Sequence, residues 1–315
     1  MFDFYPDKPI LEEAPKKKNG FLITLGSVLL FILTFSIVFP QEINFIIFLV
    51  VVLLIHELGH FLMMKRFGYQ NVRMLFVPLM GAFVQGKKKS YSQRESLLVV
   101  GSGPLPGVFI GVVLLYLAYY FEIGNLIELS ALFLFLNILN LFPIDPLDGG
   151  QIFRLLLYQR NEKFLMIFAF VSSLLIIMSG WWLDSLLVMG FGFFLGIRVR
   201  NMQKNIRVHA ELKAENVNYF CTYEELSNED YAKIRTLVIQ NSKAIRTIQE
   251  GTDDAEFEQI VAGQVNQILV EPLIKDASMI FKVFFIFLWI TAILSPLILF
   301  LTLNLKQIVD VVSAQ

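Results

Sequence analysis

Long apolar runs separated by short polar segments fill most of this chain. Seven of these runs approach or exceed the roughly 20 residues that an α-helix needs to cross the hydrocarbon core of a bilayer. They cover residues 20–40, 43–64, 97–120, 129–143, 164–180, 183–197 and 279–303. The pattern therefore predicts an all-α polytopic membrane protein with about seven transmembrane helices. The fourth and sixth runs are short, so the ends of these two helices depend on their flanking residues.

Composition supports this fold class. Hydrophobic residues make up 56% of the chain and the mean hydropathy is +0.64, whereas soluble domains are about 45–50% apolar. We therefore expect the lipid bilayer to surround an integral, multi-pass protein. The formal net charge is -1 and basic residues gather only beside the spans, which argues against a nucleic acid partner. The single cysteine, Cys221, excludes an intramolecular disulfide and a cysteine-based zinc site.

The distribution of basic residues predicts the orientation of the chain. Lys and Arg flank one set of span ends, and the loops around residues 41, 121–128 and 181 on the other side contain none. Because basic loops stay in the cytosol, we expect a cytosolic N-terminus and an external C-terminus. Residues 1–18 contain four acidic and four basic residues and no apolar core, so no cleavable signal peptide is expected.

Residues 69–90 contain an apolar stretch that Pro78, Gly81 and Gly86 interrupt. The stretch is too short and too broken to form another span. One interpretation is a short membrane-associated β-hairpin over residues 72–86, because non-helical backbone is tolerated at membrane depth where protein covers it. The other is an ordinary cytosolic loop, and periodicity does not separate the two.

Residues 198–276 have the character of a small, helical cytosolic domain. Thr222 and Glu225 have the spacing of a capping box, which predicts a helix start, and a second helix is expected over residues 256–270. The apolar stripes of the two helices are Ile234, Leu237, Val238 and Ile245, then Phe257, Ile260, Val261 and Val265. His209 lies in the polar part of this segment, and we expect it to be a solvated surface residue.

The chain thus divides into four parts. They are a cytosolic tail (1–19), a membrane domain (20–197), the soluble domain (198–276) and a C-terminal transmembrane helix with its tail (277–315). Because the soluble domain is tied to the membrane at both ends, its effective concentration there is high, which suits a regulatory or docking role. A passive linker is equally compatible with the sequence.

Three polar residues, His56, Glu57 and His60, interrupt the second span. Ionisable residues at membrane depth indicate function. Residues four apart lie on one face of a helix, so both imidazoles can bind one metal ion while Glu57 acts as a base. Catalytic zinc usually has three protein ligands and a water. Since His209 is expected at the surface, the third ligand should be a carboxylate.

Asp145 and Asp148 are the best-placed carboxylates for this role. Their segment, residues 137–150, follows the fourth span and reaches the same membrane face as the two histidines. Pro143 and Pro146 should break the helix there, and the glycines at 149–150 should let the backbone turn tightly. Residue types alone leave both aspartates open as the ligand.

Asn137 and Asn140 are three residues apart and face the same way on the helix that leads into this segment. Amide side chains between membrane helices often serve as interhelical hydrogen-bonding groups worth about a kcal/mol or less. For Asn137 we favour that structural interpretation over a catalytic one.

The pair of motifs resembles the site-2 protease family of intramembrane zinc metalloproteases. The first motif is H-E-L-G-H at 56–60, and the second is N-x-x-P-x-x-x-L-D-G at 140–149. P-x-x-G at 78–81 and G-P-L at 103–105 are weaker matches to motifs of the same family. After the second of these matches the family usually continues A-N, where this chain has Pro106 and Gly107. The resemblance covers residues 43–150, the expected catalytic core.

The resemblance implies a set of roles. His56, His60 and Asp148 would be the zinc ligands, Glu57 the general base and acid, and Asn140 a polar group near the scissile carbonyl. The substrate would be a membrane-anchored protein cut in or near its transmembrane segment, with the opened segment held by an edge strand of the 72–86 hairpin. A bacterial cell membrane is the expected location.

Two alternatives remain for the function. The class of HExxH membrane proteases that trims prenylated tails expects a glutamate as third ligand, and the N-x-x-P and L-D-G residues argue against it. A non-catalytic membrane scaffold or metal-binding regulator of the same fold would be marked by a lost ligand or base. No such loss is visible in the sequence.

Overall fold

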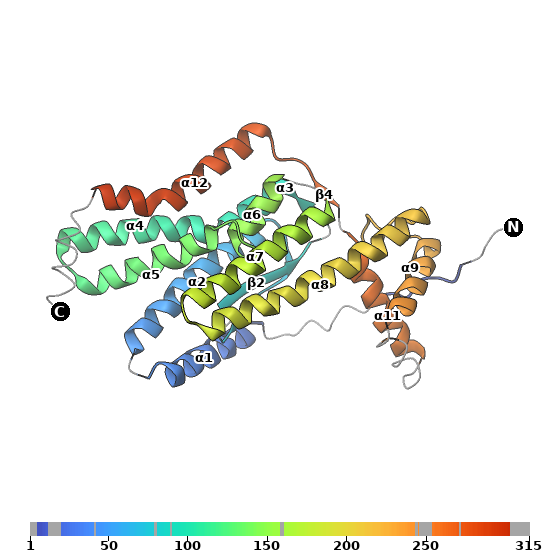
Figure 1. Cartoon of the computed structure of the whole chain (residues 1–315), viewed down its shortest axis with the longest axis horizontal. Coiled ribbons are helices and arrows are strands. Elements are labelled where there is room, and N and C mark those ends of the chain that lie inside the picture. The colour runs from blue at the N-terminus through green and yellow to red at the C-terminus, as the bar shows by residue number, and fades with distance from the viewer. Residues whose placement is uncertain are drawn as a thin grey trace. The chain divides into compact units, whose positions relative to one another are not determined.

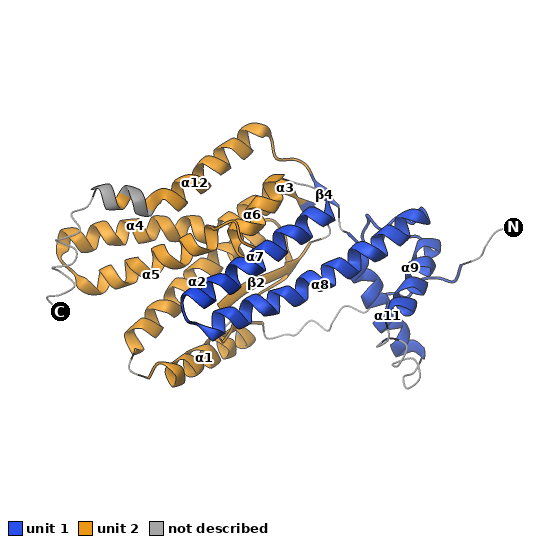
Figure 2. Ribbon diagram, in the orientation of Figure 1, with its two compact units in different colours: residues 1–16, 89–91, 159–274 blue, residues 17–88, 92–158, 275–315 orange. Residues whose placement is uncertain are grey.

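The structure is a computed structural model of the chain (Figure 1). It describes residues 5–11, 20–40, 42–78, 81–88, 90–157, 161–242, 245, 254–270 and 272–302. The chain forms two compact units (Figure 2), which we describe separately. Unit 1 contains residues 1–16, 89–91 and 159–274, and unit 2 contains residues 17–88, 92–158 and 275–315.

Unit 2 carries seven of the described helices and a β-hairpin. The helices are α1 (Gly20–Val38), α2 (Ile43–Arg66), α3 (Gln93–Gly101), α4 (Pro104–Phe121), α5 (Gly124–Leu141), α6 (Asp148–Leu157) and α12 (Met279–Thr302). The hairpin consists of β1 (Gln70–Val77) and β2 (Gly81–Lys87). Helix α12 packs on α4 and α5, and the indole Nε1 of Trp289 on α12 donates to the carbonyl of Leu141 at 2.8 Å. This bond supports the end of α5, within the second sequence motif.

Unit 1 carries four described helices. They are α7 (Glu162–Trp182), α8 (Leu186–Ala214), α9 (Asn228–Asn241) and α11 (Asp254–Ile268), and the two-residue strand β4 (Leu273–Ile274) follows them. A second two-residue strand, β3 (Tyr91–Ser92), precedes α3. Helix α8 runs through residues 197 and 198 without a break, and the predicted domain boundary there stays a prediction.

The predicted fold class is confirmed, whereas the number of spans is not. Within the described residues, four helical segments are long and apolar enough to cross a membrane: Ile43–Arg66, Gln93–Phe121, Gly124–Leu141 and Glu162–Trp182. Two more apolar helical segments, Leu22–Val38 and Met279–Ser295, are shorter. Helix α8 does not qualify, because arginines enter it from residue 198 onward. The cytosolic position of the N-terminus stays a prediction.

The predicted span 97–120 lies within the candidate span Gln93–Phe121, but this segment consists of two helices with a short break between them. Helix α3 ends at Gly101 and α4 begins at Pro104, which has no backbone N–H to donate to a carbonyl of the preceding turn. Helix α2 lies directly against this break: a Cβ built on Gly59 would be 2.0 Å from the carbonyl oxygen of Ser102. The glycine of the H-E-L-G-H motif therefore permits the close approach of backbone that brings the motif to the break.

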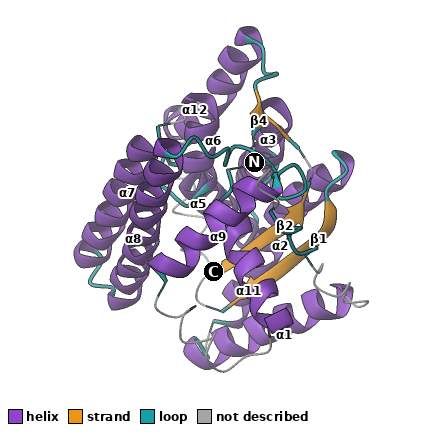
Figure 3. Cartoon of the chain, turned by 90° about the vertical axis from the view of Figure 1, so that its right-hand side faces the viewer, coloured by secondary structure: helices purple, strands orange, loops and turns teal. Residues whose placement is uncertain are grey.

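The predicted hairpin is present, so the loop interpretation was wrong. Strands β1 and β2 pair antiparallel from Gln70↔Lys87 to Val77↔Gly81, with an irregularity near the start, and Figure 3 shows them side by side. The outer edge of β1 faces α1: Thr24 Oγ1 donates to the carbonyl of Met74 at 2.7 Å, and the N–H of Phe76 donates to Ser27 Oγ at 3.1 Å. These bonds cover the β1 edge of the hairpin. The other edge is formed by β2.

The helices of unit 1 surround their own core, which includes Leu212, Ile234, Phe257 and Val261. The predicted helix start at the Thr222 capping box was wrong. Residues 222–226 form a turn, and α9 begins at Asn228, capped by Ser227, whose Oγ accepts from the N–H of Asp230 at 3.0 Å. The acidic residues that follow Ser227 favour this start because they complement the positive end of the helix.

His209 is buried, which corrects the prediction of a surface residue. Only 7% of it is exposed, and its ring stacks on Tyr219 with centroids 4.5 Å apart. Nδ1 lies 2.8 Å from Glu162 Oε1 at the start of α7, and Nε2 lies 2.8 Å from the carbonyl oxygen of Ile268 at the end of α11. The prediction failed because α8 continues as one helix past the apolar run and turns His209 toward the core of unit 1.

Candidate metal centre

Helix α2 positions the three polar residues of the first motif. His56, Glu57 and His60 are 5%, 5% and 8% exposed in a helix that is otherwise almost entirely apolar. The two imidazoles lie one turn apart on one face, with ring centroids separated by 4.9 Å. The spacing that the sequence predicts is therefore realised in the interior of unit 2.

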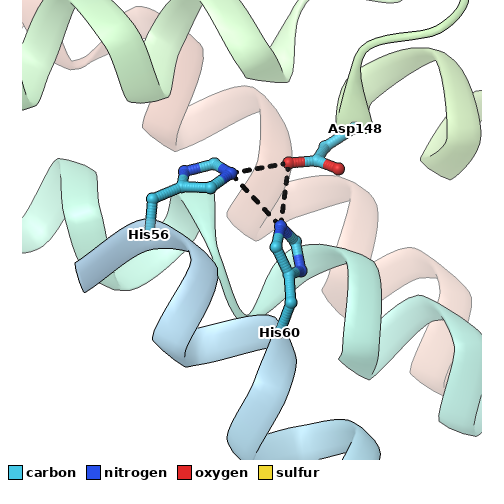
Figure 4. A group of neighbouring side chains, drawn as sticks. All are labelled: His56, His60 and Asp148. Carbon is cyan, nitrogen blue, oxygen red and sulfur yellow. Dashed lines mark hydrogen bonds and ion pairs between the residues drawn. The ribbon is translucent and has the colours of Figure 1, made fainter. Parts of the chain in front are cut away.

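Asp148, the first residue of α6, meets both imidazoles (Figure 4). Its Oδ2 lies 3.1 Å from His56 Nε2 and 3.2 Å from His60 Nε2, and the two Nε2 atoms are 3.2 Å apart. Among the described residues, these three form the one group of His, Cys, Asp or Glu side chains whose ligand atoms all lie within 4.8 Å of one another.

The other nitrogen of each imidazole faces an acceptor of the protein. His56 Nδ1 lies 2.8 Å from Asn137 Oδ1 on α5, and His60 Nδ1 lies 2.8 Å from the carbonyl oxygen of Val99 on α3. An amide or carbonyl oxygen can only accept, so each Nδ1 carries the hydrogen and each Nε2 directs a lone pair at the group. Bonds of this kind fix the tautomer of a metal-binding histidine.

Three electron-pair donors thus converge on one point, which is the environment of a cation. Two imidazoles and a carboxylate are a common ligand set for zinc, which binds such atoms at about 2.0–2.2 Å. Tetrahedral positions about 2.0 Å from a zinc ion lie about 3.3 Å from one another. The observed separations of 3.1–3.2 Å match that spacing, so the residues fit a tetrahedral zinc ion with one position left for water.

The structure separates the two candidate aspartates. Asp145 lies before α6 and forms an ion pair with Arg154, whose Nη1 is 3.2 Å from Asp145 Oδ1. The expected tight turn at Gly149 and Gly150 is absent, since both residues lie in the first turn of α6. Helix α6 therefore starts at the aspartate that reaches the histidines.

Asn137 contacts the centre directly, which the sequence interpretation did not predict. Its hydrogen bond is interhelical, as expected, but the partner is the candidate ligand His56; its Nδ2 donates to the carbonyl of Phe133 at 2.8 Å. A Cβ built on Gly107 of α4 would lie 2.2 Å from Asn137 Oδ1. Gly107, one of the two residues that depart from the family pattern, therefore makes room for the asparagine on the neighbouring helix.

The two remaining candidates are Glu57 and Asn140. The Glu57 carboxylate accepts a hydrogen bond from the backbone N–H of Val84 on β2, which ties the hairpin to the centre. Asn140 is partly buried, and its Nδ2 donates to the carbonyl of Leu136 on its own helix at 3.2 Å. The catalytic roles of Glu57 and Asn140 stay predictions.

Comparisons with known proteins agree with this geometry. The sequence profile of Peptidase family M50 matches residues 44–130, which include His56, Glu57 and His60. The chain is 36% identical over 120 residues to the zinc metalloprotease MJ0392 of Methanocaldococcus jannaschii, covering 36% of this chain and 34% of that protein. It is 31% identical over 115 residues to the stage IV sporulation protein FB of Bacillus subtilis, covering 34% of this chain and 38% of that protein.

A solved structure is also similar. The site-2 protease from Methanocaldococcus jannaschii aligns with a TM-score of 0.43 and 26% identity, covering 56% of this chain and 85% of that one. The sequence matches to the two curated relatives span little more than a third of the length of each relative. The family profile over residues 44–130 and the zinc metalloprotease relative support the resemblance to the site-2 protease family that the two motifs indicate.

Proposed function

We propose that this protein is an intramembrane zinc endopeptidase of the site-2 protease type. It would hydrolyse a peptide bond in or near a transmembrane segment of a membrane-anchored protein. The observation that carries this proposal is the convergence of His56 Nε2, His60 Nε2 and Asp148 Oδ2, 3.1–3.2 Å apart, beside the buried carboxylate of Glu57.

His56, His60 and Asp148 would hold the zinc ion, and Asn137 and the Val99 carbonyl would orient the two imidazoles. When bound, zinc supplies an electrophile and lowers the pKa of water toward about 7. Glu57 lies one residue after a ligand, so its carboxylate can accept the proton of the attacking water and donate it to the leaving amine.

The hairpin offers an edge for an unwound substrate. A peptide bond inside a helix is shielded by side chains and its carbonyl is already hydrogen-bonded, so the substrate must open before it can react. Helix α1 covers the outer edge of β1, whereas the N–H of Val84 on β2 points to Glu57. A substrate strand added beside β2 would therefore run along the carboxylate that acts on it.

Asn140 is the proposed donor to the oxyanion that develops at the scissile carbonyl. Its amide nitrogen is bonded to the carbonyl of Leu136, and it would exchange that bond for one to the substrate. An amide donor directed at developing charge stabilises it strongly where water is scarce.

For the rest of the chain we retain the arrangement that the charge distribution favours. The N-terminus would lie in the cytosol, so that the zinc site approaches the cytosolic face. Residues 198–276 would form a regulatory or docking domain at that face, held there by the membrane helices on both sides of it.

The test is Glu57→Gln in purified protein, because the amide keeps the shape of the side chain and removes the base. We expect zinc content to stay at the wild-type level and cleavage of a labelled transmembrane peptide to fall by about 10²–10⁴-fold. Asn140→Ala provides a second variant that should keep zinc and lose less activity. Cleavage by Glu57→Gln at the wild-type rate would refute the base assignment, and a wild-type protein that binds zinc without cutting any membrane protein would favour a metal-binding regulator.

A further inference from the structure

The N-terminal segment 5–11 lies against the helical part of unit 1, near α9 and α11 (Figure 1). From sequence this segment is an ordinary polar tail. In the structure its backbone and the side chains of Asp7 and Lys8 make a series of directed contacts with residues more than 200 positions away. Such contacts are unusual for a tail that serves only as a leader to the first helix.

The ammonium group of Lys8 sits in a cradle of three carbonyl oxygens. Its Nζ donates to the carbonyls of Tyr223 at 2.6 Å, Glu224 at 2.9 Å and Leu226 at 2.5 Å. It also lies 5.3 Å from the centre of the Tyr223 ring. An ammonium group has three N–H donors, so three converging carbonyls satisfy all of them, and the ring adds a cation–π contact.

The turn that forms this cradle holds its own shape. The N–H groups of Glu225 and Leu226 both donate to the carbonyl of Thr222, and the N–H of Thr222 donates to Glu225 Oε2. Tyr223 and Leu226 are buried in the core of unit 1. The internal bonds of the turn thus occupy the carbonyl of Thr222. The Lys8 ammonium binds the carbonyls of Tyr223, Glu224 and Leu226.

Side chains of α9, α11 and the 222–226 turn bind the segment on both sides of Lys8. The Lys8 N–H donates to Asn228 Oδ1 at 3.2 Å, and Asn228 Nδ2 donates to Asp7 Oδ1 at 2.8 Å. Tyr223 donates its hydroxyl to the carbonyl of Pro9 at 2.8 Å, and Gln259 Nε2 donates to the carbonyl of Ile10 at 2.9 Å. The contacts to main-chain atoms do not depend on the sequence of the bound segment. The three carbonyls around Nζ, in contrast, select a lysine side chain.

We propose that the 222–226 turn, with Asn228 and Gln259, is a peptide-binding site that selects a lysine, and that residues 7–10 of the same chain are its resident ligand. The site takes an extended segment that presents a primary ammonium followed by proline, whose fixed φ favours the extended form. The planar guanidinium of arginine does not match three carbonyls around one nitrogen, and acetylation removes the charge.

A partner protein can occupy the cradle only by displacing the tail. The tethered tail has a high effective concentration at the cradle, so a free peptide competes poorly with it. A lysine-bearing segment of another protein would displace the tail only where it is itself held close to the site. The inference is independent of the proposed protease activity, because it rests on contacts within unit 1.

The test uses the full-length protein in detergent and a fluorescent peptide with the sequence of residues 5–11. In the variant Lys8→Gln the resident ammonium is gone, so the peptide should bind at least about tenfold more tightly than it binds to wild type. A peptide with acetyl-lysine at the central position should bind that variant at least about tenfold more weakly. Lys213→Gln, which changes an exposed lysine on α8, is the matched control and should behave as wild type.

Equal binding of the lysine and acetyl-lysine peptides to Lys8→Gln would overturn the proposal, and so would the absence of binding to that variant. Amine labelling of the wild-type protein gives a second measurement that needs no variant. The caged Lys8 should react at least about tenfold more slowly than the exposed Lys213 of α8, because its ammonium must first leave three carbonyls. Reaction of the two lysines at the same rate would also contradict the proposal.

Discussion

The three histidines of this chain are all buried, and they differ in how their ring nitrogens are used. Each nitrogen of His209 in unit 1 faces its own acceptor, on α7 and at the end of α11. His56 and His60 in unit 2 use only Nδ1 for an acceptor on a neighbouring helix, and their Nε2 atoms converge with Asp148. A buried histidine therefore indicates a metal centre only when its second nitrogen converges with other ligand atoms.

Removing the carboxylate from the cluster should have the largest effect. In Asp148→Ala we expect zinc affinity to fall by at least about a hundredfold and cleavage to disappear, because zinc would retain two protein ligands. Asp145→Asn is the matched control, since Asp145 pairs with Arg154 and lies outside the cluster. Zinc content and peptide cleavage measure both effects. A larger loss of zinc in Asp145→Asn would reverse the assignment of the ligand.

Removing His209 from unit 1 should lower stability without lowering the zinc content. His209→Ala leaves the Glu162 carboxylate and the Ile268 carbonyl without this partner and opens a cavity beside Tyr219. The free energy of unfolding of unit 1 should fall by about 2–4 kcal/mol, while zinc content stays unchanged. Denaturant unfolding followed beside zinc analysis measures this, with Asn205→Ala on the exposed side of α8 as control. Loss of zinc in His209→Ala would remove the distinction drawn here.

Asn137 determines which nitrogen of His56 is available to a metal ion, because its Oδ1 occupies Nδ1. Asn137→Ala should weaken zinc binding by about 10–100-fold, as loss of a hydrogen bond to a ligand typically does. Asn137→Asp keeps the acceptor oxygen and should restore most of the affinity. Metal titration against a competing chelator measures the series. Equal affinity of Asn137→Ala and wild type would mean that the bond has only a packing role.

The smallest effect concerns an aspartate that holds a helix end instead of a metal. Burial tends to raise the pKa of Asp276, but hydrogen bonds from the Arg94 N–H and the Ser92 hydroxyl outweigh it, so the pKa is lowered from 3.8. A lowered pKa contributes stability above the unfolded-state pKa and loses it as pH falls through the folded-state value. Amide exchange at Arg94 should accordingly accelerate below about pH 4, after correction for its intrinsic pH dependence. In Asp276→Asn this additional acceleration should vanish, and its persistence would contradict the assignment.

Sequence reasoning reached the parts of the site that depend on spacing. The four-residue interval between His56 and His60 determines their common face once the segment is helical, and the L-D-G motif distinguished Asp148 from Asp145 by resemblance. The hairpin was only one of two interpretations, because 72–86 has no clear period. The break between α3 and α4 was missed, although Pro104 signals it, because the apolar run continues across it.

Contacts between distant segments were beyond the sequence. The role of Asn137 depends on α5 crossing α2, and the burial of His209 depends on α8 continuing past its apolar half. Lys8 looks like any exposed lysine until the 222–226 turn is folded around it. In each case a side chain that is unremarkable by position acquires its function from a backbone carbonyl or a side chain on another element.

X-ray absorption at the zinc edge measures whether His56, His60 and Asp148 hold one zinc ion. For the wild-type protein we expect about four nitrogen or oxygen neighbours near 2.0–2.1 Å, with the scattering pattern of two imidazoles and no sulfur. Asp148→Ala should lose this spectrum and His209→Ala should keep it. A sulfur neighbour, fewer than two imidazoles, or an unchanged spectrum in Asp148→Ala would contradict the account.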